Sequence, residues 1–164
     1  MPIHTTAGSK LYIGPVLAAK NTDFVAADFS AILDDFEEIT SMESMGQLGD
    51  TSRAVPIELI DQARDKTLKG TRSAGNMEIV CAQDAADPGQ INMIAAERTP
   101  FDYAFKVELN DKPAAGSAPK NSVRFFIGKV MSQQEVYEGA NSVRKTNFII
   151  AVNSNIVRVA ASAS

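Results

Sequence analysis

The clearest hydrophobic pattern in the chain is the strict alternation from Phe101 to Leu109. Apolar residues occupy every second position, and the positions between them are mostly charged. A period of two residues is typical of a β-strand that buries one face, so we expect an antiparallel strand whose other face meets solvent. A second alternating run, from Val123 to Ile127, changes phase at Gly128 toward Val130, which predicts a β-bulge at the glycine.

Shorter runs with the composition of β-strands occur on both sides of this pair. Glycine and proline clusters separate them, and the segment Gly70–Asn76 is expected to be a surface turn. Residues 36–45 also turn toward extended chain, followed by a loop. The expected strands are Lys10–Val16, Val55–Ile60, Lys66–Lys69, Met77–Ala82, Asn147–Val152 and Ile156–Ala160.

One helix has a clear start at Asp87 and Pro88. The Asp87 carboxylate can cap free backbone N–H groups, and Pro88 has no N–H to leave unpaired. Ile91, Ile94 and Ala95 then form an apolar stripe at helical spacing. The spacing of apolar residues from 29 to 36 predicts a second, short helical segment.

These elements predict a mainly β, antiparallel fold with one flanking α-helix. No linker, repeat or low-complexity tract divides the sequence, so residues 1–164 are expected to form a single domain. Residues 1–9 are expected to be a flexible N-terminal arm, and residues 161–164 a flexible C-terminus.

Composition removes several function classes. The 164 residues carry a net charge of −4, which argues against a basic face that holds DNA phosphates. No apolar run is long enough to span a membrane. One cysteine excludes an internal disulfide, and one histidine excludes a multi-histidine metal site.

No catalytic, cofactor-binding or metal-binding residues are predicted. The Gly70–Gly75 segment has the glycine spacing of a phosphate-binding loop, but Asn76 and Met77 replace the required Lys and Ser or Thr. The acidic pairs 34–35 and 37–38 are best explained as a solvated edge, because adjacent carboxylates do not converge on one bond. Cys81 lies in an apolar run and is expected to be a buried thiol.

Charge is unevenly distributed along the chain. Residues 23–50 contain eight carboxylates and no Lys or Arg, whereas residues 120–164 contain six basic and two acidic residues. The two stretches are either solvated loops of opposite sign or complementary surfaces for self-association. Composition does not decide between these interpretations.

The order of several motifs resembles the tail tube protein (major tail protein) of long-tailed, non-contractile bacteriophages. The resemblance covers nearly the whole chain, although each motif alone is weak. The segments that carry it are Phe36–Gly46, Lys66–Gly70, Gly75–Val80, Asp84–Gln90 with the helix that follows, Tyr103–Val107 and Arg124–Val130.

The resemblance implies an antiparallel β-sandwich or barrel-like subunit that is not an enzyme and binds no cofactor. Six copies would form a ring, and stacked rings would form a tube around a tape-measure protein and later around double-stranded DNA passing to the host. Tail tip and terminator proteins are implied as further partners, and the virion tail, assembled in the host cytoplasm, as the location. Alternatives are a tube subunit of a type VI secretion or contractile system, or a monomeric β-sandwich binding module.

The resemblance also suggests which residues make contacts between subunits. Residues 41–55 would form an extended inter-ring loop that docks on a basic surface of the neighbouring subunit. Asp102 and Glu108, on the polar face of the 101–109 strand, are candidates to line the lumen. The contact candidates are Glu43, Met45, Leu48 and Asp50 in the loop, and Arg124, Lys129, Arg144 and Lys145 on the basic side.

Overall fold

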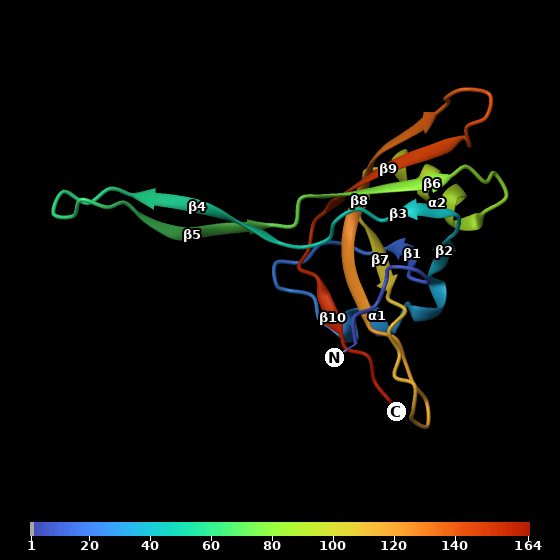
Figure 1. Cartoon of the computed structure of the whole chain (residues 1–164), viewed down its shortest axis with the longest axis horizontal. Helices are drawn as coiled ribbons and strands as arrows, with labels where there is room; N and C mark the ends of the chain where they lie inside the picture. Colours follow the sequence, from blue (N-terminus) through green and yellow to red (C-terminus); the bar gives the residue numbers. More distant parts are fainter. Residues whose placement is uncertain (1) are drawn as a thin grey trace.

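The backbone combines one large antiparallel sheet with a separate two-stranded hairpin (Figure 1). The computed structural model describes residues 2–164. The elements are β1 (Lys10–Val16), α1 (Ala26–Ser30), the 3₁₀ helix η1 (Leu33–Asp35), β2 (Glu37–Ile39), β3 (Met42–Ser44), β4 (Thr51–Ile57), β5 (Lys66–Ser73), β6 (Asn76–Ala82), α2 (Pro88–Glu97), β7 (Tyr103–Glu108), β8 (Val123–Val136), β9 (Lys145–Val152) and β10 (Val157–Val159).

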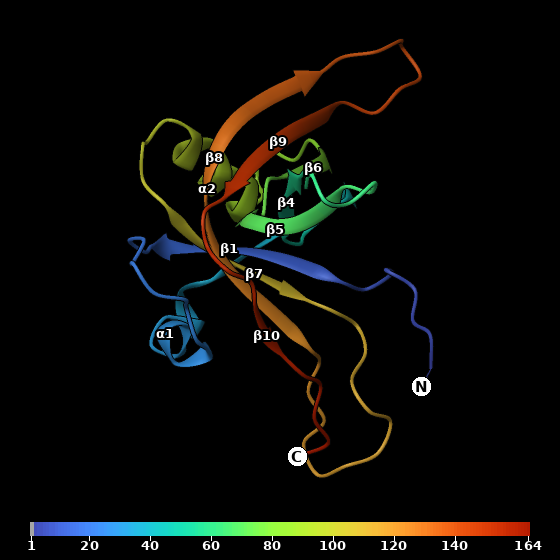
Figure 2. The same cartoon turned by 90° about the vertical axis from the view of Figure 1, so that its left-hand side faces the viewer.

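The long strand β8 connects the two halves of the large sheet. The strand order is β2-β1-β7-β8-β9-β6-β3, and β10 pairs with the start of β8. Residues 123–128 of β8 pair with β7, whereas residues 128–136 pair with β9 on the opposite edge. The halves therefore face one another across a common core, as the layers of a sandwich do (Figure 2). The predicted mainly β, antiparallel fold is confirmed.

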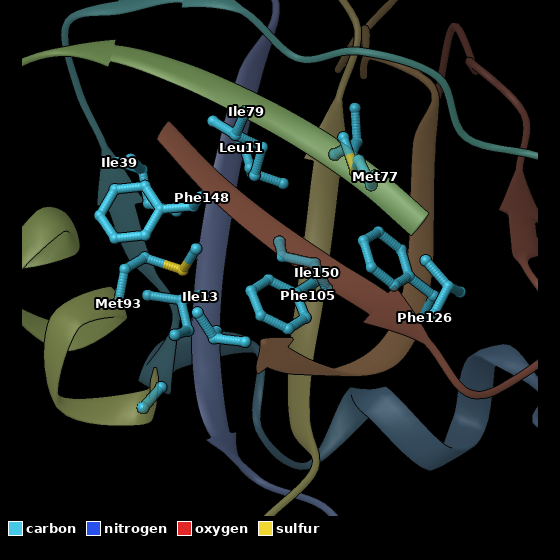
Figure 3. Close-up of a cluster of buried hydrophobic side chains, with 14 of the residues drawn as sticks. Leu11, Ile13, Ile39, Met77, Ile79, Met93, Phe105, Phe126, Phe148 and Ile150 are labelled. Atoms are coloured by element: carbon cyan, nitrogen blue, oxygen red, sulfur yellow. The ribbon is translucent and has the colours of Figure 1, made fainter. Parts of the chain in front are cut away.

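The main core lies between these halves (Figure 3). Leu11 of β1 and Phe105 of β7 come from one half, and Ile79 of β6 and Phe148 of β9 from the other. Phe126 of β8 stacks on Phe105, with ring centroids 5.4 Å apart. All five side chains are completely buried, so the core depends on strands that are distant in sequence.

A second apolar cluster covers the outer face of β7 and the first half of β8. Phe29 of α1 stacks on Phe125 with ring centroids 4.9 Å apart, and Ala104 and Ile127 lie in the same cluster. The expectation that this face of β7 meets solvent is therefore wrong at Ala104, which is fully buried. The short helical segment after residue 28, which the sequence predicts, supplies the cover.

The predicted bulge at Gly128 is also wrong. Residues 125–128 are all buried because successive side chains enter the two different clusters, so the apparent change of phase reflects burial on both faces. The shift in register lies between Val130 and Ser132. Gly128 has a different role: a Cβ there would lie 2.7 Å from the Ala151 carbonyl oxygen, closer than real contacts allow.

Helix α2 closes the open end of the core between β2 and β3. The predicted cap is confirmed, because the Asp87 carboxylate accepts a hydrogen bond from the Gln90 N–H and a second from the Thr40 N–H of the β2–β3 connection. The Gln90 side-chain amide donates to the Thr40 and Ala82 carbonyls. Gly89 packs directly on β2, where the Glu38 carbonyl leaves no room for a Cβ.

These hydrogen bonds set the rotation of α2, so the predicted apolar stripe is confirmed at Ile94, which packs against the main core, and is wrong at Ile91 and Ala95. Met93 and Ala96 are buried, whereas Ile91 is 49% exposed and Ala95 is exposed. The polar Gln90 occupies the inner face because its amide pairs with backbone carbonyls there, which apolar periodicity does not reveal.

The turn predicted over Gly70–Asn76 is shorter than expected. β5 continues to Ser73, and only Ala74 and Gly75 separate it from β6. Gly75 has a φ of +64°, a conformation that glycine adopts at little cost.

The cap at Asp87 gives a test of this fold. Replacing Asp87 by Ala leaves the Thr40 and Gln90 N–H groups without their acceptor, and we expect the free energy of unfolding to fall by about 2–3 kcal/mol. Urea denaturation measures the change. Asp84→Ala is the control, because exposed Asp84 accepts only from the nearby Ala86 N–H, and about 0.5 kcal/mol is expected. Equal losses would contradict the role given to Asp87.

Candidate assembly surface

The most prominent surface feature is the hairpin of β4 and β5, which extends far from the body (Figure 1). We call residues 51–73 the arm. Its two strands make their substantial contacts with one another and none with the large sheet. An isolated two-stranded hairpin is marginally stable in water, so this geometry indicates a surface that is completed by another molecule.

The arm has an apolar face and a basic character. Val55 and Leu68 are direct cross-strand partners, exposed by 43% and 53%, and Gly70 lies beside Val55. The two strands contain four basic residues and no carboxylate. These basic residues are Arg53, Lys66, Lys69 and Arg72.

The base of the arm is fixed by one ion pair. Arg72 donates to Asp50 at 2.8 Å, and Thr51 pairs with Ser73 across the hairpin. Asp50, an expected contact residue, therefore already has a partner in its own subunit.

The other expected contact residues of segment 41–55 lie against the body. Glu43, in the short strand β3, pairs with Lys145 at 2.9 Å, and this hydrogen bond raises the pKa of the lysine. Met45 and Leu48 are partly buried against the main core. The structure thus brings together Glu43 and Lys145, one residue from each of the two charge groups, within a single chain.

The remaining basic candidates are spread over the surface. Lys129 pairs with Asp102 at 3.0 Å. Arg124 is half-buried and donates to the Val123 carbonyl, and desolvation lowers its pKa. Arg144 is exposed in the β8–β9 connection. A role for any of these residues between subunits stays a prediction.

The two lumen candidates have polar partners of their own. Asp102 accepts from Asn153 as well as from Lys129. Glu108 accepts from Asn121 at 2.8 Å and from the hydroxyl of Tyr12 at 3.4 Å. Burial and the neighbouring carboxylates of Glu108 and Glu38 raise the pKa of Tyr12 to about 12. A lumen-lining role of these two acids stays a prediction.

The sequence analysis missed the arm, although part of its signal was present. Two short expected strands separated by the five mostly polar residues 61–65 are typical of a hairpin, and the two lysines of the second strand, Lys66 and Lys69, mark it as exposed. No local pattern reveals that the hairpin extends away from the body. Its position depends on which edges of the large sheet are already occupied by other strands, and those strands are distant in the sequence.

The residues considered for chemistry do not form a reactive centre in the part of the chain that the structure describes. In residues 2–164 no three His, Cys, Asp or Glu side chains gather to hold a metal. The same residues contain no helix of the length and apolar character that a bilayer requires. Gly70 lies inside β5, and Asp34, Asp35 and Glu37 are exposed.

Comparisons with known proteins show what this architecture is similar to. No family model and no curated protein matches the sequence. A chain of the anti-feeding prophage baseplate, in a structure symmetrised six-fold, matches with a TM-score of 0.66 at 10% identity, over 98% of each chain. The SPP1 tail tube matches with a TM-score of 0.61 at 14% identity, over 97% of this chain and 80% of that one. The chain has the tail tube fold.

A third structure agrees. The virion of a native gene transfer agent contains a chain that matches with a TM-score of 0.53 at 15% identity, over 76% of this chain and 89% of that one. The expected resemblance to tail tube proteins is thus confirmed at the level of the fold. The choice of a non-contractile system stays a prediction.

Within the tail tube fold, Cys81 provides a test of the main core. Its side chain is fully buried in β6, as expected, and burial raises the pKa of the thiol from 9.0 to about 12. We expect no reaction with a chromogenic disulfide reagent at pH 8 in the folded protein and complete reaction in guanidinium, measured by absorbance. The folded state keeps this proton up to a higher pH than the unfolded chain does. The free energy of unfolding that the protonated thiol contributes is therefore lost as the pH rises from 9.0 toward about 12. Rapid modification of the folded protein would contradict this burial.

Proposed function

We propose that the protein is the subunit of a tube and polymerises as stacked six-membered rings around a lumen. The observation that carries this proposal is the arm, whose exposed apolar face and basic strands have no partner in the described part of the chain other than one another and Asp50. The similar structures come from a baseplate, a tail tube and a virion, and the first is six-fold symmetrised.

Open sheet edges support ring formation. Beyond Gly128, no described strand pairs with β8 on the side opposite to β9, so residues 131–136 present free backbone groups. The short strands β2 and β3 end the large sheet on either side. Such edges favour pairing with another chain, and a closed ring of sheets removes them.

Contacts along the tube axis would use the arm. The sequence suggested residues 41–55 as the inter-ring loop, but of these only residues 51–55 belong to the arm, and β3 is paired with β6. We therefore assign the inter-ring reach to residues 51–73. A contact between two different surfaces of the same chain does not close on itself along the axis, which is what a tube requires.

The proposed lumen would enclose a tape-measure protein and later conduct double-stranded DNA. Six chains with a charge of −4 give a ring of net negative charge, which repels phosphate and lets DNA slide. Asp102 and Glu108 remain the proposed lining residues, and tail tip and terminator proteins the proposed partners at the ends. In this function the protein is a virion component assembled in the host cytoplasm and has no enzymatic activity.

Removing the arm tests the proposal. Ser52 and Arg72 are paired, so residues 53–71 can be replaced by an Asn-Gly turn that keeps the Arg72–Asp50 ion pair at the base. We expect negative-stain microscopy to show tubes of the unaltered protein and none of the variant at the same concentration. Circular dichroism and the melting temperature should show that the variant keeps the folded body, because the described arm makes no substantial contact with the large sheet.

A control variant keeps the arm but shortens a different protruding segment. Replacing residues 138–142, in the β8–β9 connection, by two glycines removes similarly exposed chain. We expect this variant to form tubes. A compact monomer of the unaltered protein at every concentration would contradict the proposed function and favour a monomeric binding module, as would tubes of normal length from the arm deletion.

A further inference from the structure

A groove on the body has the shape and charge to receive another chain. It lies between α1, η1, β10 and the 109–122 connection and has a volume of about 730 Å³. Sites of roughly 300–1,000 Å³ bury a drug-sized ligand, so two aliphatic side chains fit. Its floor is apolar and is formed by Leu33, Val123, Phe125 and Val159.

Two lysines stand at the rim of this groove. Lys112 and Lys120 are exposed, and within residues 2–164 neither has a carboxylate within 4.0 Å. Glu108 also lines the groove, but Asn121 and Tyr12 already bind its carboxylate. The groove therefore combines an apolar floor with free positive charge.

The tip of the arm has the complementary composition. The Gln62 N–H donates to the Leu59 carbonyl at 3.1 Å, which closes a turn with Ile60 and Asp61 at its centre. Ile60 is completely exposed, and Leu59 is 37% exposed. Glu58 and Asp61 flank this apolar pair with negative charge.

The tip does not reach the groove of its own chain. A seven-residue strand spans roughly 23 Å, and β4 runs this distance away from the body. Figure 1 shows α1 and β10 on the body, with the arm extending to the left, away from the body. An occupant with the composition of the tip must therefore come from a second copy.

We propose that the Leu59–Ile60 turn of one subunit inserts into the groove of another, with Glu58 and Asp61 meeting Lys112 and Lys120. This inference rests on the proposed tube function and names the docking site of the arm. Each subunit offers one tip and one groove on different surfaces, so the contact propagates from copy to copy. Burying a fully exposed isoleucine strengthens association roughly ten- to hundredfold.

A charged residue at the tip tests the apolar part of the contact. Ile60→Asp places a carboxylate against the groove floor, and we expect tubes to disappear or to need at least ten times more protein, as measured by sedimentation and microscopy. Gln62→Asp is the matched control, because it adds the same charge to the same exposed turn and leaves Ile60 in place. Equal assembly of both variants would overturn the proposal.

A cysteine pair tests the position of the contact. Ala160 lines the groove and is exposed, so Ile60→Cys with Ala160→Cys should give a ladder of disulfide-linked oligomers on a non-reducing gel. Buried Cys81 does not interfere. The control combines Ile60→Cys with Ala140→Cys, at the exposed end of the β8–β9 connection, and should give nothing larger than dimers.

The two assays separate this proposal from the proposed function. Two results would overturn the tip–groove contact and leave the tube function standing: tubes of Ile60→Asp at the protein concentration that suffices for the unaltered protein, or tubes of the variant with Ile60→Cys and Ala160→Cys that give no disulfide-linked ladder. A ladder without tubes in any condition would support the contact and contradict the tube. Loss of tubes by Ile60→Asp but not by Gln62→Asp, together with a ladder, supports both.

Discussion

The burial of both faces of β8 is the constraint on which the rest of the structure depends. Phe126 enters the main core and Phe125 the second cluster, so one strand holds the two halves of the sheet together and also carries α1. Pairing of β8 with β7 ends at Gly128, where pairing with β9 on the opposite edge begins, and the register with β9 shifts between Val130 and Ser132. One continuous sheet can therefore enclose a core, with α2 and its cap at Asp87 closing the remaining opening.

This architecture explains why the arm is free to leave the body. Both edges of β6, the strand that follows the arm, are occupied, by β9 and by β3, so β5 cannot continue into a pairing beside β6, and β4 and β5 pair with one another instead. Their basic side chains prevent collapse onto an apolar surface, while Val55 and Leu68 keep an apolar face available. A subunit of this kind is stable through its core and incomplete at its arm, which suits repeated addition of identical copies.

The sequence predicts the elements better than it predicts their surroundings. The strand alternation and the capped helix are local properties, and both are confirmed in class and approximate position. Two of the three stripe positions on α2 and the phase at Gly128 are wrong, because the hydrogen bonds of Gln90 and the burial of the second face of β8 depend on segments far away in the chain. The partners of the expected contact residues are also absent from the local pattern. The acidic excess of residues 23–50 does not reveal that Glu43 and Asp50 form ion pairs within their own subunit.

The net charge of the chain is divided unequally between the arm and the body, and the two parts have opposite signs. The arm contains five basic and three acidic residues, a net charge of +2, which leaves −6 for the rest of the chain. Bodies of like charge repel one another, whereas a cationic arm is attracted to any acidic body, including that of a neighbouring copy. Within the arm the sign reverses again, because the acids are confined to the 58–65 connection at its tip. Long-range attraction through the strands can therefore bring two copies together, while the acidic tip selects the lysine-rimmed groove on a body whose net charge is negative.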